Sequence, residues 1–564
     1  MSANPSLRVV LCWHMHQPYY RDAVEGEYKL PWTYLHAIKD YEDMVALLEE
    51  NPAARAVVNF TPTLLEQIHD YAQQTRDYLH HGTQLRDPLL AALVAEQMPQ
   101  DELQQVGLVR ACLRANEKRV IHRFPAYRYL SEIAATVLKR QPYAPYFSDQ
   151  YLADLLVWYH LAWLGETVRH SDERVKALMQ AQHGYTVRDR QVLLEVLSES
   201  MQSVIGRYRN LAESGRIELS VTPYGHPIVP LLLDMHSTHQ AMPEAPLPVQ
   251  PHYPGGEARA RWHVEEGLQV FEDFFGFRPV GCWPSEGAVS EATLALLGES
   301  GFRWAASGES VLRNSLHASE VTSHGCIHHP YTHVGSPLTC FFRDDGLSDL
   351  IGFTYSDWHA EDAVGNLIHH LENIANACQD DPNRVVSIIM DGENAWEYYP
   401  ENGYHFLTTL YQRLSHHPDL ELTTFSDCLK QGLQPTSLSR LIAGSWVYGT
   451  FSTWIGETQK NRAWELLVEA KQAFDTVVAQ GRLEPQQLHL VERQLAICEG
   501  SDWFWWFGDY NPGESVKDFD RLYRHQLQAL YQLLGLTPPD SLQQVISQGG
   551  GDAESGGVMR RGKE

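Results

Sequence analysis

Two acidic residues, Glu286 and Asp391, stand where apolar runs give way to polar turns. Asp391 ends the run VVSIIM and precedes Gly392, a residue that lets the backbone turn closely. A carboxyl group held among aromatic side chains is partly desolvated, so its pKa rises toward the range of a general acid. Each carboxylate could instead stabilise the N-terminus of the helix that follows it. As a pair at different strand ends, they match the acid and the nucleophile of glycosidic bond cleavage.

A second candidate group is the histidine pair His14 and His16, two residues apart after the first apolar run. On a strand, this spacing aims both rings to one side. They could ligate a metal ion together with a third ligand such as Asp344 or His226, or they could be structural. Hydrogen bonding to a sugar or to a catalytic carboxylate is the favoured interpretation. The adjacent histidine pairs expected at the surface are His80-His81, His328-His329, His369-His370 and His416-His417.

Aromatic residues gather in two segments near the C-terminus, in a chain with 15 Trp and 27 Tyr. The first segment runs from Ser445 to Trp464 and includes Trp454, and the second runs from Asp502 to Asp509. Such rings can pack in a helical core. They can also stack on sugar rings while neighbouring carboxylates accept hydrogen bonds from hydroxyl groups. The residues by themselves favour neither role.

The candidate residues follow short apolar runs that are typical of buried parallel strands. Seven runs are predicted to be strands: Leu7–Trp13, Ala56–Phe60, Ile217–Thr222, Pro279–Trp283, Arg303–Ser307, Leu338–Arg343 and Val385–Asp391. Helical stretches separate most of them, which indicates a parallel sheet or barrel. Barrel enzymes carry their reactive groups at the carboxyl ends of the strands, and five of these strand ends offer His or carboxylate residues.

Two regions show the periodicity of helices. Residues 62–210 predict a helical insertion, with helices at Leu89–Ala95, Leu103–Asn116, Tyr129–Lys139 and Arg190–Glu213. A later region predicts a bundle, with helices at Ala463–Val478, Gln486–Cys498 and Val516–Leu534. Residues 547–564 are Gly-rich and polar, so we expect a disordered tail.

The composition argues against several classes of function. The chain has 44 Lys and Arg against 71 Asp and Glu, and the resulting net charge of −27 argues against nucleic-acid and anionic membrane partners. No apolar run reaches the roughly 18 residues of a membrane span. The N-terminus lacks the pattern of a secretion signal, so we expect a cytoplasmic protein. The eight cysteines are scattered without a C-x-x-C pair and are expected to be reduced, buried thiols.

Five motifs, in order, resemble those of glycoside hydrolase family 57, in its amylopullulanase and α-amylase branch. They are HMHQP at His14–Pro18, GRIELSVTPYGHPIVPLL from Gly215, CWPSEGA at Cys282–Ala288, MDGENAWEYY at Met390–Tyr399, and SWVYGTFSTWIGETQKNRAWELL from Ser445. The resemblance covers roughly residues 7–530. Five motifs in the same order are far more specific than any one of them.

The resemblance implies an α/β fold, an incomplete (β/α)7 barrel with a helical insertion, followed by a C-terminal helical domain that completes the active site. It implies a catalytic unit at 1–435 and the helical domain at 436–546. It also implies retaining cleavage of α-glucosidic bonds without a metal or cofactor, with Glu286 as nucleophile and Asp391 as general acid/base. The implied substrate contacts are His14, His16, His226, Trp283, Arg343, Glu393, Trp396, Trp454 and Asp502.

The expected substrate is an α-glucan or maltooligosaccharide, cut at α-1,4 bonds and possibly at α-1,6 bonds. With a sugar hydroxyl as acceptor, the same carboxylates would make a 4-α-glucanotransferase or a branching enzyme. An alternative of another class is a metal-dependent carbohydrate deacetylase or mannosidase that uses His14 and His16. A third is a non-catalytic glucan-binding protein. No oligomeric state is predicted.

Overall fold

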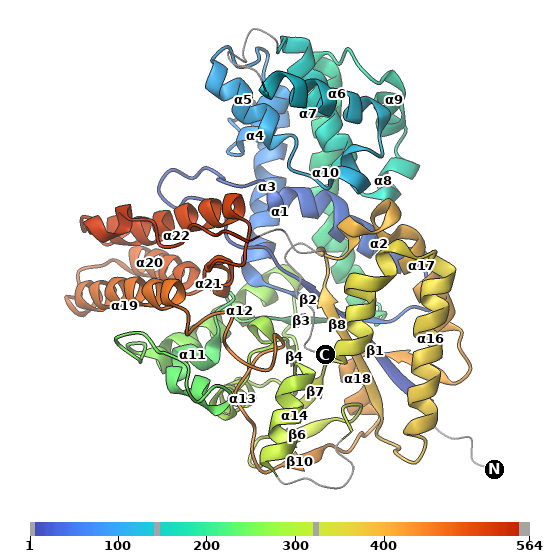
Figure 1. Ribbon diagram of the computed structural model, residues 1–564, viewed down its shortest axis with the longest axis vertical. Coiled ribbons are helices and arrows are strands. Elements are labelled where there is room, and N and C mark those ends of the chain that lie inside the picture. Colours follow the sequence, from blue (N-terminus) through green and yellow to red (C-terminus); the bar gives the residue numbers. More distant parts are fainter. Residues whose placement is uncertain (1–5, 140–146, 320–325, 552–564) are drawn as a thin grey trace.

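The computed structural model describes residues 6–139, 147–319 and 326–551, and within them ten strands form one sheet (Figure 1). Seven parallel strands form its main part: β1 (Leu7–Met15), β2 (Ala56–Phe60), β3 (Ile217–Val221), β4 (Gly281–Cys282), β5 (Trp304–Ser307), β7 (Thr339–Phe342) and β8 (Val385–Asp391). Their order is β7-β5-β4-β3-β2-β1-β8. A parallel bridge between Arg343 and Ser387 joins the end of β7 to β8, so the sheet curls back on itself. This agrees with the expected (β/α)7 barrel and confirms all seven predicted strands.

Three short strands lie outside this set: β6 (Tyr331–His333), β9 (Leu420–Thr423) and β10 (Thr436–Leu438). β6 pairs antiparallel with β7, β10 pairs with β6, and β9 pairs with β1. They were not expected from the sequence. Their burial is incomplete, so they lack the continuous apolar run that marks a fully buried strand.

The register of the central strands brings the candidate residues to one edge of the sheet. His14 in β1 lies opposite Asp391 in β8 and opposite Asn59 in β2. β8 is buried along VVSIIM and becomes partly exposed only at Asp391. Because these strands are parallel, their carboxyl ends all lie at the same edge, which is where barrel enzymes build their sites.

The insertion contains α3 (Pro62–His81), α4 (Pro88–Val94), α5 (Glu102–Ala111), α6 (Pro125–Leu138), α7 (Asp149–Trp163), α8 (Glu166–Ser171), α9 (Glu173–Ala181) and α10 (Val187–Glu213). Its smaller helices gather at the top of the view in Figure 1. The four predicted helices are confirmed as α4, α5, α6 and α10. α5 ends before the predicted Asn116 because the side chain of Asn116 caps a new turn by accepting a hydrogen bond from the Arg119 N–H.

The remaining helices before residue 435 are α1 (Trp32–His36), α2 (Glu42–Glu50), α11 (Val229–Leu233), α12 (Gly256–Phe275), α13 (Glu291–Glu299), α14 (Glu309–Ala318), α15 (Asp345–Asp349), α16 (Ala360–Ala377), α17 (Tyr404–Ser415) and α18 (Phe425–Lys430). Among the described helices, none combines the length and the apolar character needed to cross a membrane.

Four helices follow near the C-terminus: α19 (Thr458–Ala479), α20 (Pro485–Cys498), α21 (Ser501–Trp506) and α22 (Gly513–Leu533). Three of them confirm the predicted helices, and α21 is additional. They pack through aromatic contacts, such as the stacked rings of Trp464 and Phe504 at 4.4 Å. The division of the chain near residue 435 stays a prediction.

The predicted disorder of residues 547–564 does not hold at its beginning. The backbone N–H of Ser547 donates to Asp520 in α22, and its hydroxyl accepts from the Gly508 N–H. These hydrogen bonds give a Gly-rich segment an ordered path that its composition does not suggest. Residues 552–564 lie outside the described part of the chain.

Replacing Gly281 in β4 with Ala should destabilise the fold. An added Cβ would lie 1.9 Å from the indole of Trp304, and that indole is held by a hydrogen bond to Glu218. Overpacking of this kind costs about 1–3 kcal/mol, measurable as a lower urea midpoint. The control is Gly107→Ala, on an exposed stretch of α5 with open space around it, which should leave the midpoint unchanged or raise it slightly. Equal midpoints for the two variants would contradict this account of β4.

Candidate active site

A cavity of about 660 Å³ opens at the carboxyl ends of the strands. The predicted residues on its lining are His14, His16, His226, Glu286, Arg343, Asp391, Glu393 and Asp502. The two carboxyl groups, more than a hundred residues apart in sequence, therefore face one cavity. The insertion contributes Arg114 and Lys118, and the C-terminal helices contribute Trp505 and Trp506.

Glu286 lies in a short 3-10 turn directly after β4 and adopts φ 59°, ψ 22°. Left-handed backbone at a residue with a Cβ is strained and persists only when its surroundings hold it. Trp446 supplies that support twice: its backbone N–H donates to the Glu286 carbonyl at 3.0 Å, and its indole N–H donates to Oε2 at 2.9 Å. The Ser501 hydroxyl lies 3.3 Å from Oε1. The turn thus aims the carboxylate at donors from distant segments.

Asp391 ends β8, where Gly392 allows the chain to pass very close to β1. A Cβ at Gly392 would lie 2.1 Å from the sulfur of Met15, and its N–H donates to the His14 carbonyl at 2.7 Å. Asn394 donates a hydrogen bond to Oδ2 of Asp391 at 2.9 Å. Asp391 therefore has fewer side-chain donors than Glu286 among the described residues.

Burial dominates the electrostatics of both acids. It raises the pKa of Glu286 from 4.5 to about 8, with further contributions from Asp391 and Asp502 and an opposing one from the Trp446 hydrogen bond. Burial also raises the pKa of Asp391, opposed by Asn394, His16 and Arg343. Two nearby carboxyl groups of this kind titrate as a pair that keeps one proton at neutral pH.

Three histidine rings stack beside the acids. The rings of His16 and His226 lie 3.8 Å apart at an interplanar angle of 15°, and His14 lies 5.3 Å from His226. Burial lowers the pKa of His14 to about 3, although its Nδ1 is 2.7 Å from Asn59 Oδ1. Burial would also lower the pKa of His16, but the Asp502 carboxylate at 2.7 Å raises it. The stack thus places His16, whose pKa the Asp502 carboxylate raises, beside two rings whose pKa burial lowers.

His226 reaches Glu286 through Ser501. Its Nδ1 lies 2.7 Å from the Ser501 hydroxyl and 4.0 Å from Glu286 Oε1. Burial, with the charge on His16, lowers the pKa of His226 well below its ordinary value. Its Nε2 has no hydrogen-bond partner among the described residues. A buried donor or acceptor of this kind needs a ligand to satisfy it.

His16, His226 and Asp502 lie close enough to be considered as metal ligands. His16 Nε2 and Asp502 Oδ1 are 2.7 Å apart, however, and His16 Nδ1 lies 3.1 Å from the Thr61 hydroxyl. Two ligands of one tetrahedral ion stand about 3.3 Å apart, given metal–ligand bonds of about 2.0–2.1 Å. The spacing is that of a hydrogen bond, and His16 uses both ring nitrogens, so this group fits a metal ion poorly.

Comparison with known proteins identifies the family. The family model described as glycosyl hydrolase family 57 matches residues 10–441, which include both candidate acids. The chain belongs to this family. No curated protein matches the chain with significant sequence similarity.

Several solved structures share the fold of this family 57 chain. A branching enzyme from Thermococcus kodakaraensis, in complex with glucose, has a TM-score of 0.59 at 15% identity, covering 93% of this chain and 90% of that one. An α-amylase from Thermotoga maritima has a TM-score of 0.59 at 13% identity, covering 95% and 96%. A branching enzyme from Pyrococcus horikoshii has a TM-score of 0.54 at 15% identity, covering 97% and 98%. At these identities the likeness concerns the fold.

Three of the predicted substrate contacts do not line the cavity of the family 57 chain. Trp283, Trp396 and Trp454 are fully buried. Trp283 packs edge-on against Trp446 at 5.2 Å, which supports the residue that holds Glu286. Trp396 donates to the Gly392 carbonyl and so fixes the turn after Asp391. Because these rings are buried, they present no face to a sugar. Their role is to pack around the site and stabilise it.

Arg343 lines the cavity and is held by the protein through three hydrogen bonds. Its guanidinium donates to the Ile389 carbonyl, to Asp345 and to Asp349, and it lies 5.6 Å from the ring of Trp446. Arg343 thus connects the end of β7 to β8 and positions Trp446. These bonds use three of the five guanidinium N–H donors.

The most informative residues that the sequence interpretation passed over are Trp446 and Ser501, which bond to Glu286. Trp446 lies in the first segment noted for aromatic residues and Ser501 directly precedes the second, yet nothing in the spacing shows which residue faces the acid. Trp32, Arg114 and Lys118 were also passed over. Trp32 begins α1, whereas Arg114 and Lys118 belong to the insertion. The sequence does not show that these elements reach the cavity, because that depends on how they pack over the sheet.

The raised pKa of Glu286 predicts a pH-dependent stability difference. Because the folded state holds the proton more tightly than the unfolded state, this group's contribution is fully present below pH 4.5 and is lost as pH rises to about 8. Glu286→Gln removes the titration, so its stability relative to wild type should increase by a few kcal/mol between pH 5 and pH 8. Urea unfolding across that range measures it. The exposed Glu257→Gln should run parallel to wild type, and a parallel Glu286→Gln curve would refute the assignment.

Proposed function

We propose that this protein is a retaining, α-glucan-active glycoside hydrolase that cleaves α-1,4 bonds through a glycosyl-enzyme intermediate. The observation that carries the proposal is the pair Glu286 and Asp391 on one cavity, with hydrogen-bond donors concentrated on Glu286. A nucleophile must be ionised and a general acid must be protonated. The donors on Glu286 act toward that state, whereas burial, which raises the pKa of Glu286 to about 8, acts against it.

In the proposed first step, a Glu286 oxygen attacks the anomeric carbon while Asp391 protonates the leaving oxygen. In the second step, Asp391 takes a proton from water, which attacks the same carbon and releases Glu286. Each step inverts the anomeric centre, so the overall reaction retains its configuration. When protonated, His16 near both acids would stabilise negative charge that develops on the carboxylate leaving group.

The lining suits a neutral sugar chain. Trp32, Trp505, Trp506 and Phe519 offer flat apolar faces that match the faces of pyranose rings. The unsatisfied His226 Nε2 and Glu393 Oε2 offer polar partners for sugar hydroxyls. The solved structures of similar fold bear the names of branching enzymes and an α-amylase, all of which act on α-glucans.

A second candidate is transfer to a sugar hydroxyl, as in a branching enzyme or 4-α-glucanotransferase. Two of the similar solved structures are named as branching enzymes, which supports transfer as the second candidate. The same two carboxylates would act in transfer, and the acceptor decides the outcome.

The proposed localisation is cytoplasmic, and we propose the catalytic unit at residues 1–435 with the helical domain at 436–546.

Glu286→Gln and Asp391→Asn should each lower kcat on maltoheptaose by at least about a thousandfold while the protein stays folded, because each removes a reacting group. Chromatography of the products separates the alternatives: shorter chains indicate hydrolysis, longer linear chains indicate 4-α-transfer, and α-1,6 branches indicate branching. Proton magnetic resonance of the first product should show the α-anomer. A β-anomer, near-normal activity of either variant, or acetate release from acetylated sugars without glucan cleavage would each overturn the proposal.

Trp446→Phe tests the support of the nucleophile. It removes the N–H donor to Glu286 while keeping an aromatic ring, so the pKa of Glu286 should rise further. The acid limb of the kcat/KM profile should then move to higher pH, and kcat/KM at neutral pH should fall by about 10- to 100-fold. The matched control is Trp506→Phe, which alters a lining ring with no bond to Glu286 and should change KM without moving that limb. Coincident pH profiles for wild type and Trp446→Phe would contradict the role of Trp446.

A further inference from the structure

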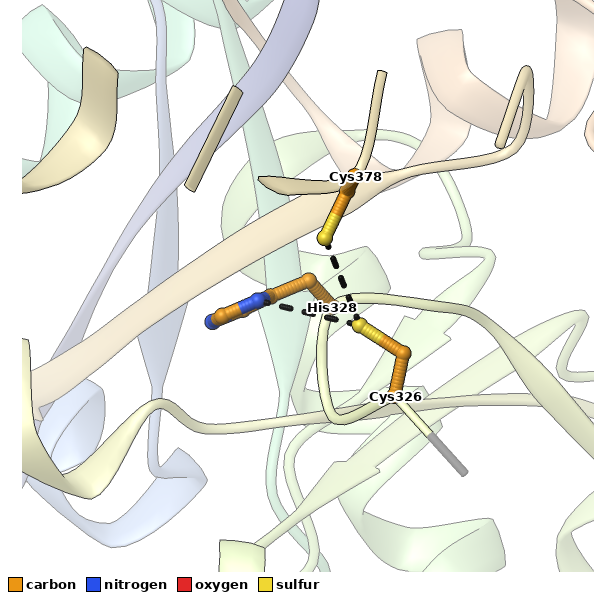
Figure 2. A group of neighbouring side chains, drawn as sticks. All are labelled: Cys326, His328 and Cys378. Atoms are coloured by element: carbon orange, nitrogen blue, oxygen red, sulfur yellow. Dashed lines mark hydrogen bonds between the residues drawn. The ribbon is translucent and has the colours of Figure 1, made fainter. Parts of the chain in front are cut away.

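A second cluster of reactive side chains lies outside the active-site cavity. Cys326, His328 and Cys378 direct two sulfurs and one ring nitrogen toward one another (Figure 2). The two sulfurs are 3.6 Å apart, and His328 Nδ1 is 3.9 Å from Cys326 Sγ. Cys326 and His328 precede β6, whereas Cys378 is the residue that ends α16. None of the three lines the catalytic cavity.

This spacing matches ligands of one tetrahedral ion. Zinc bonds of about 2.3 Å to sulfur and about 2.0–2.1 Å to nitrogen place two sulfurs about 3.8 Å apart and a sulfur and a nitrogen about 3.5 Å apart. The two separations that involve Cys326 differ from these by a few tenths of an ångström, and all three ligand atoms lie within 4.8 Å of one another. Rotations of the side chains would therefore bring all three atoms onto one ion.

The far side of His328 supplies an independent observation. Its Nε2 lies 2.8 Å from Oδ2 of Asp344, while its Nδ1 faces the sulfurs. Asp344 is itself fixed, because its Oδ1 accepts the Leu347 N–H at the start of α15. A metal-binding histidine almost always donates its second ring N–H to such a carboxylate, which fixes the ring and increases its basicity. The sequence interpretation had placed the pair His328-His329 at the surface, but both rings are mostly buried.

We propose that Cys326, His328 and Cys378 bind one Zn²⁺ ion through the two Sγ atoms and Nδ1, with a fourth position open to water. Two thiolates and an imidazole select zinc over magnesium or calcium, which require oxygen ligands. A disulfide between the two cysteines accounts less well for the cluster. It needs the sulfurs to close from 3.6 Å to about 2.05 Å, and it gives no role to the Asp344–His328 pair.

The ion would hold together segments that frame the active site. The His328 carbonyl accepts the N–H of Val385 at the start of β8, and the Cys378 carbonyl accepts a hydrogen bond from Arg384. β8 carries Asp391 at its other end, and Asp344 follows Arg343, which lines the cavity. The site therefore has a structural role: it connects the end of α16 to β8 and to the turn that carries Arg343.

Cobalt substitution tests the proposal directly. The full-length protein, reduced and stripped of metal, is titrated with Co²⁺. We expect near-ultraviolet sulfur-to-cobalt charge transfer and the visible bands of tetrahedral Co²⁺, saturating at one ion per chain and abolished by added Zn²⁺. Cys326→Ser, Cys378→Ser and His328→Gln should each lose or strongly weaken these bands. Cys428→Ala is the matched control, because it removes a buried thiol in an apolar cluster, and it should retain them.

Bands that are absent in folded wild-type protein, or that persist at full intensity in all three variants, would overturn the proposal. So would elemental analysis without zinc together with a mapped Cys326–Cys378 disulfide in the protein as purified. If the variants fail to fold, thiol alkylation of wild type decides instead. Bound Zn²⁺ should slow labelling of the Cys326 and Cys378 peptides at least tenfold, and unchanged labelling would count against the site.

Discussion

The burial of two carboxyl groups beside one cavity is the constraint on which the rest of the structure depends. Removing a carboxylate from water costs free energy, and a second one nearby increases the cost, so the pair keeps a proton that exposed acids would release. The surroundings must then decide which acid carries the charge. Here Trp446 and Ser501 bond to Glu286, whereas Asn394 alone among the described residues bonds to the side chain of Asp391.

Maintaining that asymmetry requires segments that are remote in sequence. Glu286 comes from the turn after β4, Trp446 from the segment before α19, and Ser501 from the start of α21. The backbone of Glu286 is strained, and Trp446 holds it at both its carbonyl and its carboxylate. Trp283 and Arg343 in turn support Trp446. This arrangement concentrates hydrogen-bond donors from distant segments on one buried carboxyl group.

The two ends of β8 have different roles in this picture. Its carboxyl end carries Asp391 into the cavity. Its beginning contacts the segment of His328 and Cys378, where we place a zinc ion. Rigid elements position reacting groups better than mobile ones because catalysis depends on sub-ångström geometry. A strand secured at its start by an ion and along its length by β1 meets that requirement.

The sequence by itself determined the seven strands and the helices with clear periodicity, and it pointed to two acids that line one cavity. Continuous apolar runs and polar strand ends are local signals, and five ordered motifs identified the family that the comparison confirmed. Local signals failed where polar or short segments depend on distant partners. β6, β9 and β10 are too short and too exposed to have an apolar signature, and Ser547 becomes ordered through Asp520.

Only the tertiary structure decided which members of each motif face the cavity. Trp283, Trp396 and Trp454 stand in the recognised motifs but are buried, whereas Trp446 bonds to Glu286. Spacing along a strand or turn gives the direction of a side chain relative to its own segment. It does not say which other segment lies opposite, since that follows from how the helices pack on the sheet. The cluster of Cys326, His328 and Cys378 illustrates the same limit, because its ligands come together only when the end of α16 meets the segment before β6.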